Sequence, residues 1–118
     1  LDQSIRLKKN KEFRYTYKRG RSLKGKYLVI YFCENGQENS KIGFSVSKKI
    51  GKAIIRNLSK GFYVKYAVLK EIVQGYNIIF VARSKIKGIK YRLVEEEMLD
   101  LLKKAELPGS LHDYKNTD

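Results

Sequence analysis

A continuous apolar run, Ile78-Ile79-Phe80-Val81-Ala82, restricts the fold of this chain more than any other segment. Successive residues of a strand point to opposite faces of a sheet, so a run without a polar member predicts a strand covered on both faces. We therefore expect residues 76–83 to form a strand inside a sheet that has packed layers on both sides. The chain has 118 residues, which is enough for one core of this kind and too few for two.

Two segments with strand character precede this run, and the turn-like sequence Glu34-Asn35-Gly36-Gln37 separates them. We expect residues 27–33 and 41–47 to pair as an antiparallel hairpin. Alternation along both strands predicts that one face is apolar and belongs to the core. The residues on that face are Leu28, Ile30, Phe32, Ile42, Phe44 and Val46.

The other face of the expected hairpin combines tyrosines with very small residues. Gly43 and Ser45 leave room above the sheet, so Tyr27 and Tyr31 are expected to floor a shallow groove. An aromatic floor beside positive charge suits unpaired nucleotides, because every base offers a face for stacking. The alternative is that a helix covers this face and buries the tyrosines.

A short helix is expected over residues 11–19, with Asn10 as its N-cap and Gly20 as its C-terminal stop. Phe13 and Tyr17 are four residues apart and therefore share one face of this helix. Phe13 fits a core position as well as a ligand surface, whereas the hydroxyl group of Tyr17 favours the surface.

A basic ladder follows one edge of a long helix that we expect to begin after Gly51 and to end near Gly75. Its members recur every four residues, and no acidic residue lies between positions 41 and 70. This spacing suits the tracking of phosphates, and the planar guanidinium group of Arg56 is able to hold two oxygens. The alternative is a solvated basic face. The ladder is Lys52, Arg56 and Lys60, with Lys48 and Lys49 in the preceding loop, and a neighbouring apolar stripe comprises Ile55, Leu58, Phe62, Tyr66, Leu69 and Val73.

A last helix is expected over residues 91–104, with an inner stripe of Val94, Met98, Leu101 and Ala105. The consecutive glutamates at positions 95–97 are interpreted as a solvated face near the helix start. We interpret residues 1–107 as one domain and residues 108–118 as a flexible tail.

Charge narrows the class of function. The net charge is +14, and residues 1–60 contribute +12 of it, with 16 Lys and Arg against 4 Asp and Glu. Such an excess favours a polyanionic partner, with nucleic acid first, over a generically basic soluble surface.

A single Cys33 and a single His112 support neither a disulfide framework nor a metal site held by the protein. No apolar run approaches the roughly 18 residues of a membrane span, and the first residues lack signal-peptide order, so we expect a cytoplasmic protein without a membrane partner.

One ordered set of residues resembles the signature of the bacterial ribonuclease P protein component. The set is Ser45-Val46-Ser47-Lys48-Lys49-Ile50-Gly51-Lys52-Ala53, followed by Arg56-Asn57 and Lys60. Arg6-Leu7-Lys8-Lys9 with Phe13 supports it upstream, and residues 78–83 support it downstream, so the resemblance covers about residues 4–107. One segment departs from the pattern: where the family continues Lys-Arg-x-x-Arg-Glu, this chain has Gly61-Phe62-Tyr63-Val64-Lys65 after Lys60. Two expected arginines are therefore absent, which weakens the helical half of the signature.

The resemblance implies a division of labour. In that family a small protein binds a large catalytic RNA, the RNA and the substrate hold Mg²⁺, and together protein and RNA remove the 5′ leader from precursor tRNA. It implies no catalytic or metal-binding residue in the protein, and no need for a protein oligomer. By the same resemblance, the RNA subunit contacts Lys48, Lys49, Lys52, Arg56, Asn57 and Lys60, and the leader contacts Phe13, Tyr17, Tyr27 and Tyr31.

The expected fold class is α+β, a single-domain α/β sandwich with the order α-β-β-β-α-β-α and a mixed central sheet. The resemblance implies a left-handed βαβ crossover through the long helix, although connection rules alone favour the right-handed form in about 98% of cases.

Two other functions remain as alternatives. A structural or ribosomal-type RNA-binding protein explains the charge but not the ordered motif. A stand-alone protein nuclease lacks a paired acid and base in the basic half.

Overall fold

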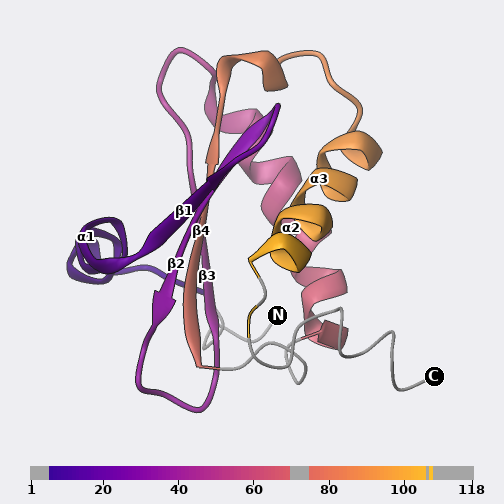
Figure 1. The fold of residues 1–118 in the computed structure, drawn as a ribbon. Helices are drawn as coiled ribbons and strands as arrows, with labels where there is room; N and C mark the ends of the chain where they lie inside the picture. The colour runs from indigo at the N-terminus through magenta and orange to yellow at the C-terminus, as the bar shows by residue number, and fades with distance from the viewer. Residues whose placement is uncertain (1–5, 70–74, 106, 108–118) are drawn as a thin grey trace.

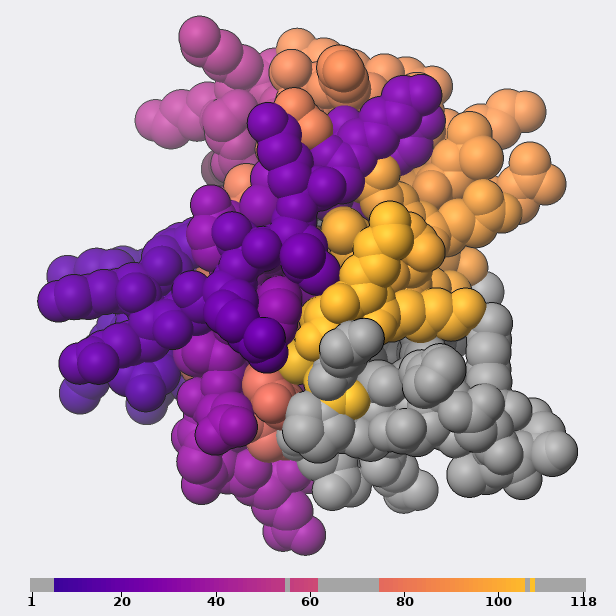
Figure 2. Space-filling model, viewed as in Figure 1, coloured from indigo at the N-terminus to yellow at the C-terminus, as the bar shows by residue number. Residues whose placement is uncertain are grey.

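Three layers make up the molecule (Figure 1). The computed structural model describes residues 6–69, 75–105 and 107. Helix α1 (Asn10–Arg19) covers one face of a four-stranded sheet, and helices α2 (Lys52–Leu69) and α3 (Tyr91–Lys104) cover the other. In the space-filling view, side chains of α1 project outward from one side of the molecule (Figure 2). The strands are β1 (Arg21–Lys24), β2 (Leu28–Glu34), β3 (Lys41–Ser45) and β4 (Tyr76–Ala82). The predicted element order is confirmed, with one short 3-10 turn, η2 (Ser84–Ile86), added after β4.

The sheet has the order β1-β2-β4-β3, so the predicted hairpin is wrong. Strands β2 and β3 run in opposite directions, but β4 lies between them, antiparallel to β2 and parallel to β3. Phe80 at the centre of β4 pairs with Ile30 on one side and Phe44 on the other. This order places the most apolar strand where both its edges and both its faces are covered. Residues 35–40 connect β2 to β3 and need to cross only about two strand spacings, roughly 10 Å.

The main core lies between the sheet and helices α2 and α3. The alternation predicted for the strands is confirmed at Leu28, Ile30, Phe32 and Ile42, which are at most 3% exposed. Phe44 and Val46 are half-buried and pack against this cluster. The inner stripe predicted for the last helix is confirmed, because Val94, Met98, Leu101 and Ala105 are all buried.

The long helix confirms one member of its predicted core stripe, Leu58, which is buried. The side chains of the other members, at positions 55, 62, 66, 69 and 73, lie outside the described residues, as do the predicted tail at 108–118 and the expected end of the helix near Gly75. Helix α2 connects β3 to the adjacent parallel strand β4. The left-handed sense of this crossover stays a prediction of the resemblance. No helix in the described part of the chain is long and apolar enough to cross a membrane.

The start of α1 differs from the prediction by one residue. Asn10 is the first helical residue and Lys9 occupies the cap position, where it makes no side-chain cap bond. The predicted stop at Gly20 is confirmed, and its N–H donates to the carbonyl oxygen of Thr16. Gly20 is needed there because a β-carbon would lie 2.4 Å from that same oxygen.

Candidate nucleic-acid interface

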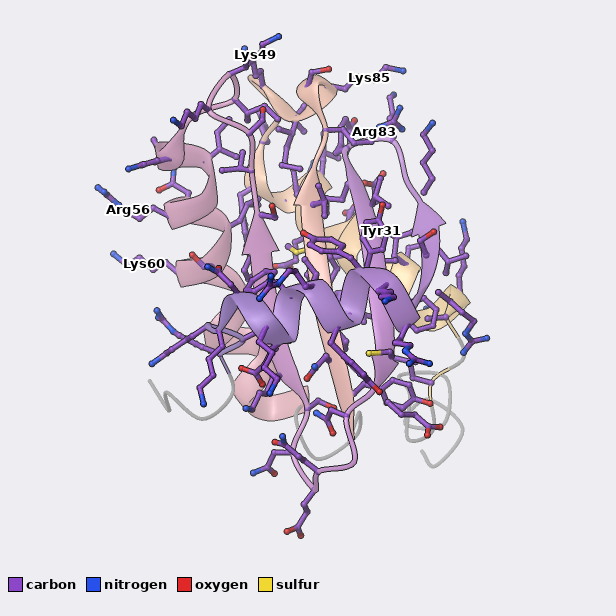
Figure 3. The ribbon with its side chains drawn as sticks, turned by 90° about the vertical axis from the view of Figure 1, so that its left-hand side faces the viewer. Tyr31, Lys49, Arg56, Lys60, Arg83 and Lys85 are labelled. Carbon is purple, nitrogen blue, oxygen red and sulfur yellow. The ribbon has the colours of Figure 1, made fainter. Side chains whose placement is uncertain are left out.

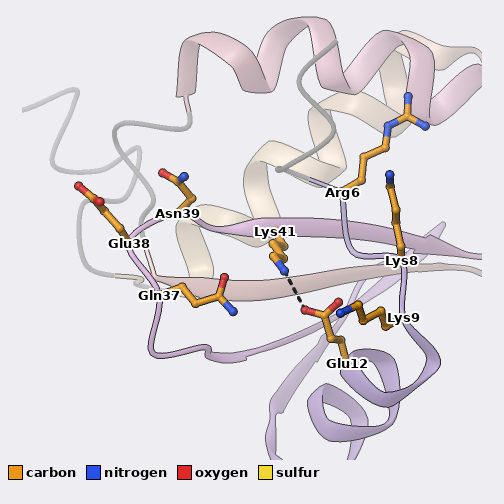
Figure 4. Close-up of a pocket in the computed structure, with 8 residues that line it drawn as sticks. All are labelled: Arg6, Lys8, Lys9, Glu12, Gln37, Glu38, Asn39 and Lys41. Carbon is orange, nitrogen blue, oxygen red and sulfur yellow. Dashed lines mark hydrogen bonds and ion pairs between the residues drawn. The ribbon is translucent and has the colours of Figure 1, made fainter.

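Polar contacts fix α1 on its face of the sheet. The Lys41 ammonium group on β3 lies 3.0 Å from a carboxylate oxygen of Glu12 on α1, and both side chains are half-buried. This ion pair lies in a pocket of about 430 Å³ that the amino-terminal segment also lines (Figure 4). Deeper in the layer, the side-chain amide of Asn77 on β4 donates to the hydroxyl oxygen of the fully buried Thr16. Helix α1 is therefore fixed relative to the central strand.

Three of the four predicted leader-binding aromatics meet between α1 and the sheet. The ring centroids of Phe13 and Tyr17 are 6.4 Å apart, and Tyr17 lies edge-on to Tyr31 at 4.9 Å. The room predicted above Gly43 exists, but Phe13 fills it, since a β-carbon on Gly43 would lie 2.7 Å from the Phe13 ring. The alternative that a helix covers this face therefore holds in part. Tyr31 is half-buried, whereas Tyr17 remains 38% exposed.

Tyr27 is separate from this aromatic group. It lies just before β2, four residues from Tyr31, which corresponds to about 13 Å along a strand. Its half-buried ring packs against the main core, and the ammonium group of Lys26 lies 5.6 Å from the ring centroid. Tyr27 and Tyr31 therefore do not form one continuous floor.

A groove of about 450 Å³ joins the aromatic group to the basic segment. One wall is α1, the other is the end of the edge strand β3, and the groove runs to the loop before α2 and the first residue of that helix. Aromatic and cationic side chains therefore line one open channel, the combination that single-stranded nucleic acid requires. The lining residues are Asn10, Phe13, Tyr17, Phe44, Ser45, Val46, Ser47, Lys48 and Lys52.

The basic ladder lies at the end of this groove. Lys52, Arg56 and Lys60 are all exposed on α2, and Figure 3 shows Arg56 and Lys60 projecting from the same edge of the helix. Eight residues of helix make the ladder about 12 Å long. The other predicted RNA contacts, Lys48, Lys49 and Asn57, are exposed as well.

Gly51 sets the geometry between the loop and the ladder. Its φ of +101° lies in the region that glycine adopts readily and other residues rarely do. The preceding residues form a turn in which the N–H of Ile50 donates to the carbonyl oxygen of Ser47. The backbone therefore turns sharply at Gly51, and α2 begins at the next residue, Lys52, as expected from the sequence.

Gly61, the first residue of the segment that departs from the family pattern, has a packing role. A β-carbon there would lie 2.6 Å from the Tyr91 ring at the start of α3. The glycine therefore permits close contact between the two helices. Burial and the neighbouring Glu95 raise the pKa of the Tyr91 hydroxyl well above its usual range.

Sequence reasoning missed two features of the candidate interface and its surroundings. The first is that Arg83 and Lys85, which follow β4, lie at the same end of the molecule as Lys49 (Figure 3), so the basic surface is broader than the ladder. Nothing in the sequence indicated that these residues lie at the same end of the molecule as Lys49.

The second missed feature is Glu97, which is not part of a simply solvated face. Its carboxylate accepts three backbone N–H bonds, from Lys26, Tyr27 and Leu28, at 2.6 to 2.8 Å. Arg83 closes the same turn by donating to the carbonyl oxygen of Gly25 at 2.6 Å. Helix α3 therefore fixes the turn that carries Tyr27.

Within the described residues, no three His, Cys, Asp or Glu side chains are grouped so that they could hold a metal ion. His112 lies outside the described residues. The arrangement of the described residues is suited to binding and positioning a polyanion.

Comparisons with known proteins agree with this geometry. Residues 1–106 match the family model described as Ribonuclease P. The ribonuclease P protein component of Alkaliphilus oremlandii is 43% identical over 107 residues, covering 89% of this chain and 94% of that protein. The corresponding protein of Clostridium botulinum is 40% identical over 103 residues, covering 85% and 93%. The solved structure of the Staphylococcus aureus RNase P protein superimposes with a TM-score of 0.77 at 31% identity, covering 87% of this chain and 96% of that one. The chain therefore belongs to the ribonuclease P protein family, the RNA-binding protein components of the ribonucleoprotein that processes tRNA 5′ ends.

Proposed function

We propose that this protein binds two RNAs through two neighbouring surfaces. The ladder and its loop, Lys48, Lys49, Lys52, Arg56, Asn57 and Lys60, bind the catalytic RNA subunit. The groove beside α1 receives the 5′ leader of precursor tRNA on Phe13 and Tyr17, with Tyr31 edge-on to Tyr17, while Tyr27 contacts the leader from the start of β2. The observation that carries this proposal is the groove itself, in which Tyr17 and Lys52 line one channel.

In this proposal the RNA subunit performs the hydrolysis. Magnesium is held mainly by the RNA subunit and the substrate, because the described residues of the protein do not fit a site for it. They contain no group of three His, Cys, Asp or Glu side chains that could hold a metal ion, and the half-buried Glu12 of α1 is already paired with Lys41. The protein contributes by screening repulsion between two RNAs and by retaining the leader, so that precursor is bound in preference to product. The proposed place of action is the cytoplasm, and no protein oligomer is required.

The experiment that tests this proposal is cleavage of precursor tRNA by rigorously RNA-free protein, by the RNA subunit alone, and by both together. We expect no cleavage by the protein, and a benefit of adding protein to the RNA that shrinks as magnesium or salt is raised, since added cations replace screening. Metal-dependent cleavage by the RNA-free protein would overturn the assignment of chemistry to RNA. If the protein increases cleavage by the RNA subunit as much at high magnesium as at low magnesium, charge screening is not the protein's main contribution.

A further inference from the structure

A second aromatic side chain of α1 is exposed on the side away from the groove. Tyr15 is 51% exposed, more than the other exposed large hydrophobic side chains of the described residues. It lies two residues from both Phe13 and Tyr17, which places it about 200° around the helix from each of them. Tyr15 therefore belongs to a different surface from the aromatic group beside Gly43.

This surface contains a pocket of about 390 Å³. Its floor consists of two largely buried aromatic rings, Phe32 and Tyr76, which are both at most 7% exposed. The volume falls within the range of small-ligand sites, roughly 300–1,000 Å³. The pocket lies where the end of α1, the start of β1, the end of β2 and the start of β4 meet, and its lining residues are Tyr15, Arg19, Arg21, Phe32, Cys33, Glu34 and Tyr76.

Charged groups of both signs surround the pocket. The Arg21 guanidinium group lies 5.0 Å from the centroid of the Phe32 ring, so it is held over the floor. Exposed Arg19 adds a second cation. Among the residues that the structure describes, the exposed carboxylate of Glu34 has no ion-pair or hydrogen-bond partner. Burial raises the pKa of the Tyr76 hydroxyl, Glu34 raises it further and Arg21 lowers it, which indicates that both charges surround one hydroxyl group.

This combination of groups favours guanine over adenine. An exposed aromatic ring stacks on any base, and arginines hold phosphate oxygens. A carboxylate, however, is only an acceptor. The Watson–Crick edge of guanine presents two adjacent donors, N1–H and the N2 amino group, whereas adenine presents a lone pair at N1. A carboxylate therefore accepts two bonds from guanine and meets repulsion at N1 of adenine.

We propose that the pocket binds an unpaired guanosine nucleotide of RNA, with Tyr15 stacking on the base, Glu34 accepting N1–H and N2–H, and Arg19 and Arg21 holding the phosphate. The site is distinct from the groove that is proposed for the leader, and its existence does not depend on that assignment. Its RNA source is either the leader of the substrate or an unpaired segment of the RNA subunit.

Titrations of the full chain followed by NMR test the site with three probes: guanosine 5′-monophosphate, adenosine 5′-monophosphate and inorganic phosphate. We expect guanosine monophosphate to perturb the amides of residues 15, 19, 21 and 32–34, and to bind about tenfold more tightly than the adenosine compound, since one good base contact contributes about 1–3 kcal/mol of discrimination. Equal responses to the two nucleotides, or a response to phosphate that equals both, would overturn the proposal.

Two variants and one control sharpen this test. Glu34→Gln should abolish the guanosine preference while retaining binding, and Tyr15→Ala should weaken both nucleotides by at least about fivefold. Glu38→Gln removes the same charge from another exposed glutamate, outside this pocket, and should change neither property. If Tyr15→Ala instead alters self-association of the protein and leaves nucleotide binding unchanged, the pocket is a contact between copies of this chain and the proposal fails.

The RNA source follows from a second pair of measurements. Glu34→Gln is compared with the unaltered protein for binding of the RNA subunit alone, and for binding of precursor tRNA to the assembled complex with leaders that carry or lack guanosine. A loss of several-fold in the first supports the RNA subunit as the source, and a guanosine-dependent loss in the second supports the leader. No loss in either would contradict a role of the site in this ribonucleoprotein.

Discussion

Replacing the three cations of the ladder, as Lys52→Gln, Arg56→Gln and Lys60→Gln together, should weaken binding of the RNA subunit in a salt-dependent way. All three side chains are exposed, so their loss leaves the fold intact, and removal of Lys52 from the first turn of α2 is mildly favourable for the helix. Each phosphate contact contributes a slope of about −0.7 to −0.9 to the plot of log affinity against log salt. Three lost contacts should therefore make the slope shallower by about 2 to 3.

The measurement is a titration of the RNA subunit with protein at salt concentrations from about 50 to about 200 mM, at constant magnesium. Over this fourfold range the unaltered protein should lose about 20- to 40-fold more affinity than the variant. A matched control removes three cations from α3 and the residue before it, as Lys90→Gln, Arg92→Gln and Lys104→Gln, all of which are exposed. If the two triple variants give the same slope, the effect reflects net charge, and the ladder is not the interface.

The remaining predictions concern single side chains. Tyr31→Ala should weaken binding of leader-bearing precursor by about 1–3 kcal/mol with no effect on binding of mature tRNA. The same result for Tyr27→Ala would show that the leader reaches the start of β2. Equal losses for precursor and mature tRNA would contradict stacking on the leader. Gly43→Ala should lower the free energy of unfolding by about 1–3 kcal/mol in urea denaturation, because the added methyl group would lie 2.7 Å from an atom of the ring above it; unchanged stability would contradict that packing. Glu97→Ala should lower the free energy of unfolding by about 2–4 kcal/mol, because three backbone hydrogen bonds to its carboxylate are lost. Glu96→Ala, at an exposed neighbouring position, should have almost no effect. Equal losses for the two variants would contradict the role of Glu97 in holding the turn before β2.

Much of the fold could be predicted from local pattern, because local pattern decides strand and helix identity. The apolar run at residues 78–82 predicted a central strand, and alternation predicted the buried faces of β2 and β3. The pairing of strands could not be predicted in this way. Strands β2 and β3 are close in the sequence, but they do not pair because β4 lies between them. What decides that order is the gain from covering both edges of the most apolar strand, which is a property of the whole sheet.

The candidate site was predictable to a similar degree. Helical spacing predicted the exposed edge of α2, and spacing also predicted that Phe13 and Tyr17 share a face. Contacts between residues distant in the sequence were not visible. The bonds from Lys26, Tyr27 and Leu28 to Glu97 join positions 69 to 71 apart, and the pocket around Tyr15 depends on four elements meeting.

The central claim of the account is that two separable surfaces bind two RNAs. The most direct test measures, for one set of proteins, both the affinity for the RNA subunit and the ratio of precursor to mature tRNA affinity in the assembled complex at saturating protein. We expect Tyr17→Ala with Tyr31→Ala to lower the precursor-to-mature ratio and to leave RNA-subunit affinity unchanged. We expect Arg56→Gln with Lys60→Gln, at ladder positions that do not line the groove, to do the reverse. If both sets of substitutions lowered both quantities in the same proportion, the groove and the ladder would be one surface and the account would be contradicted.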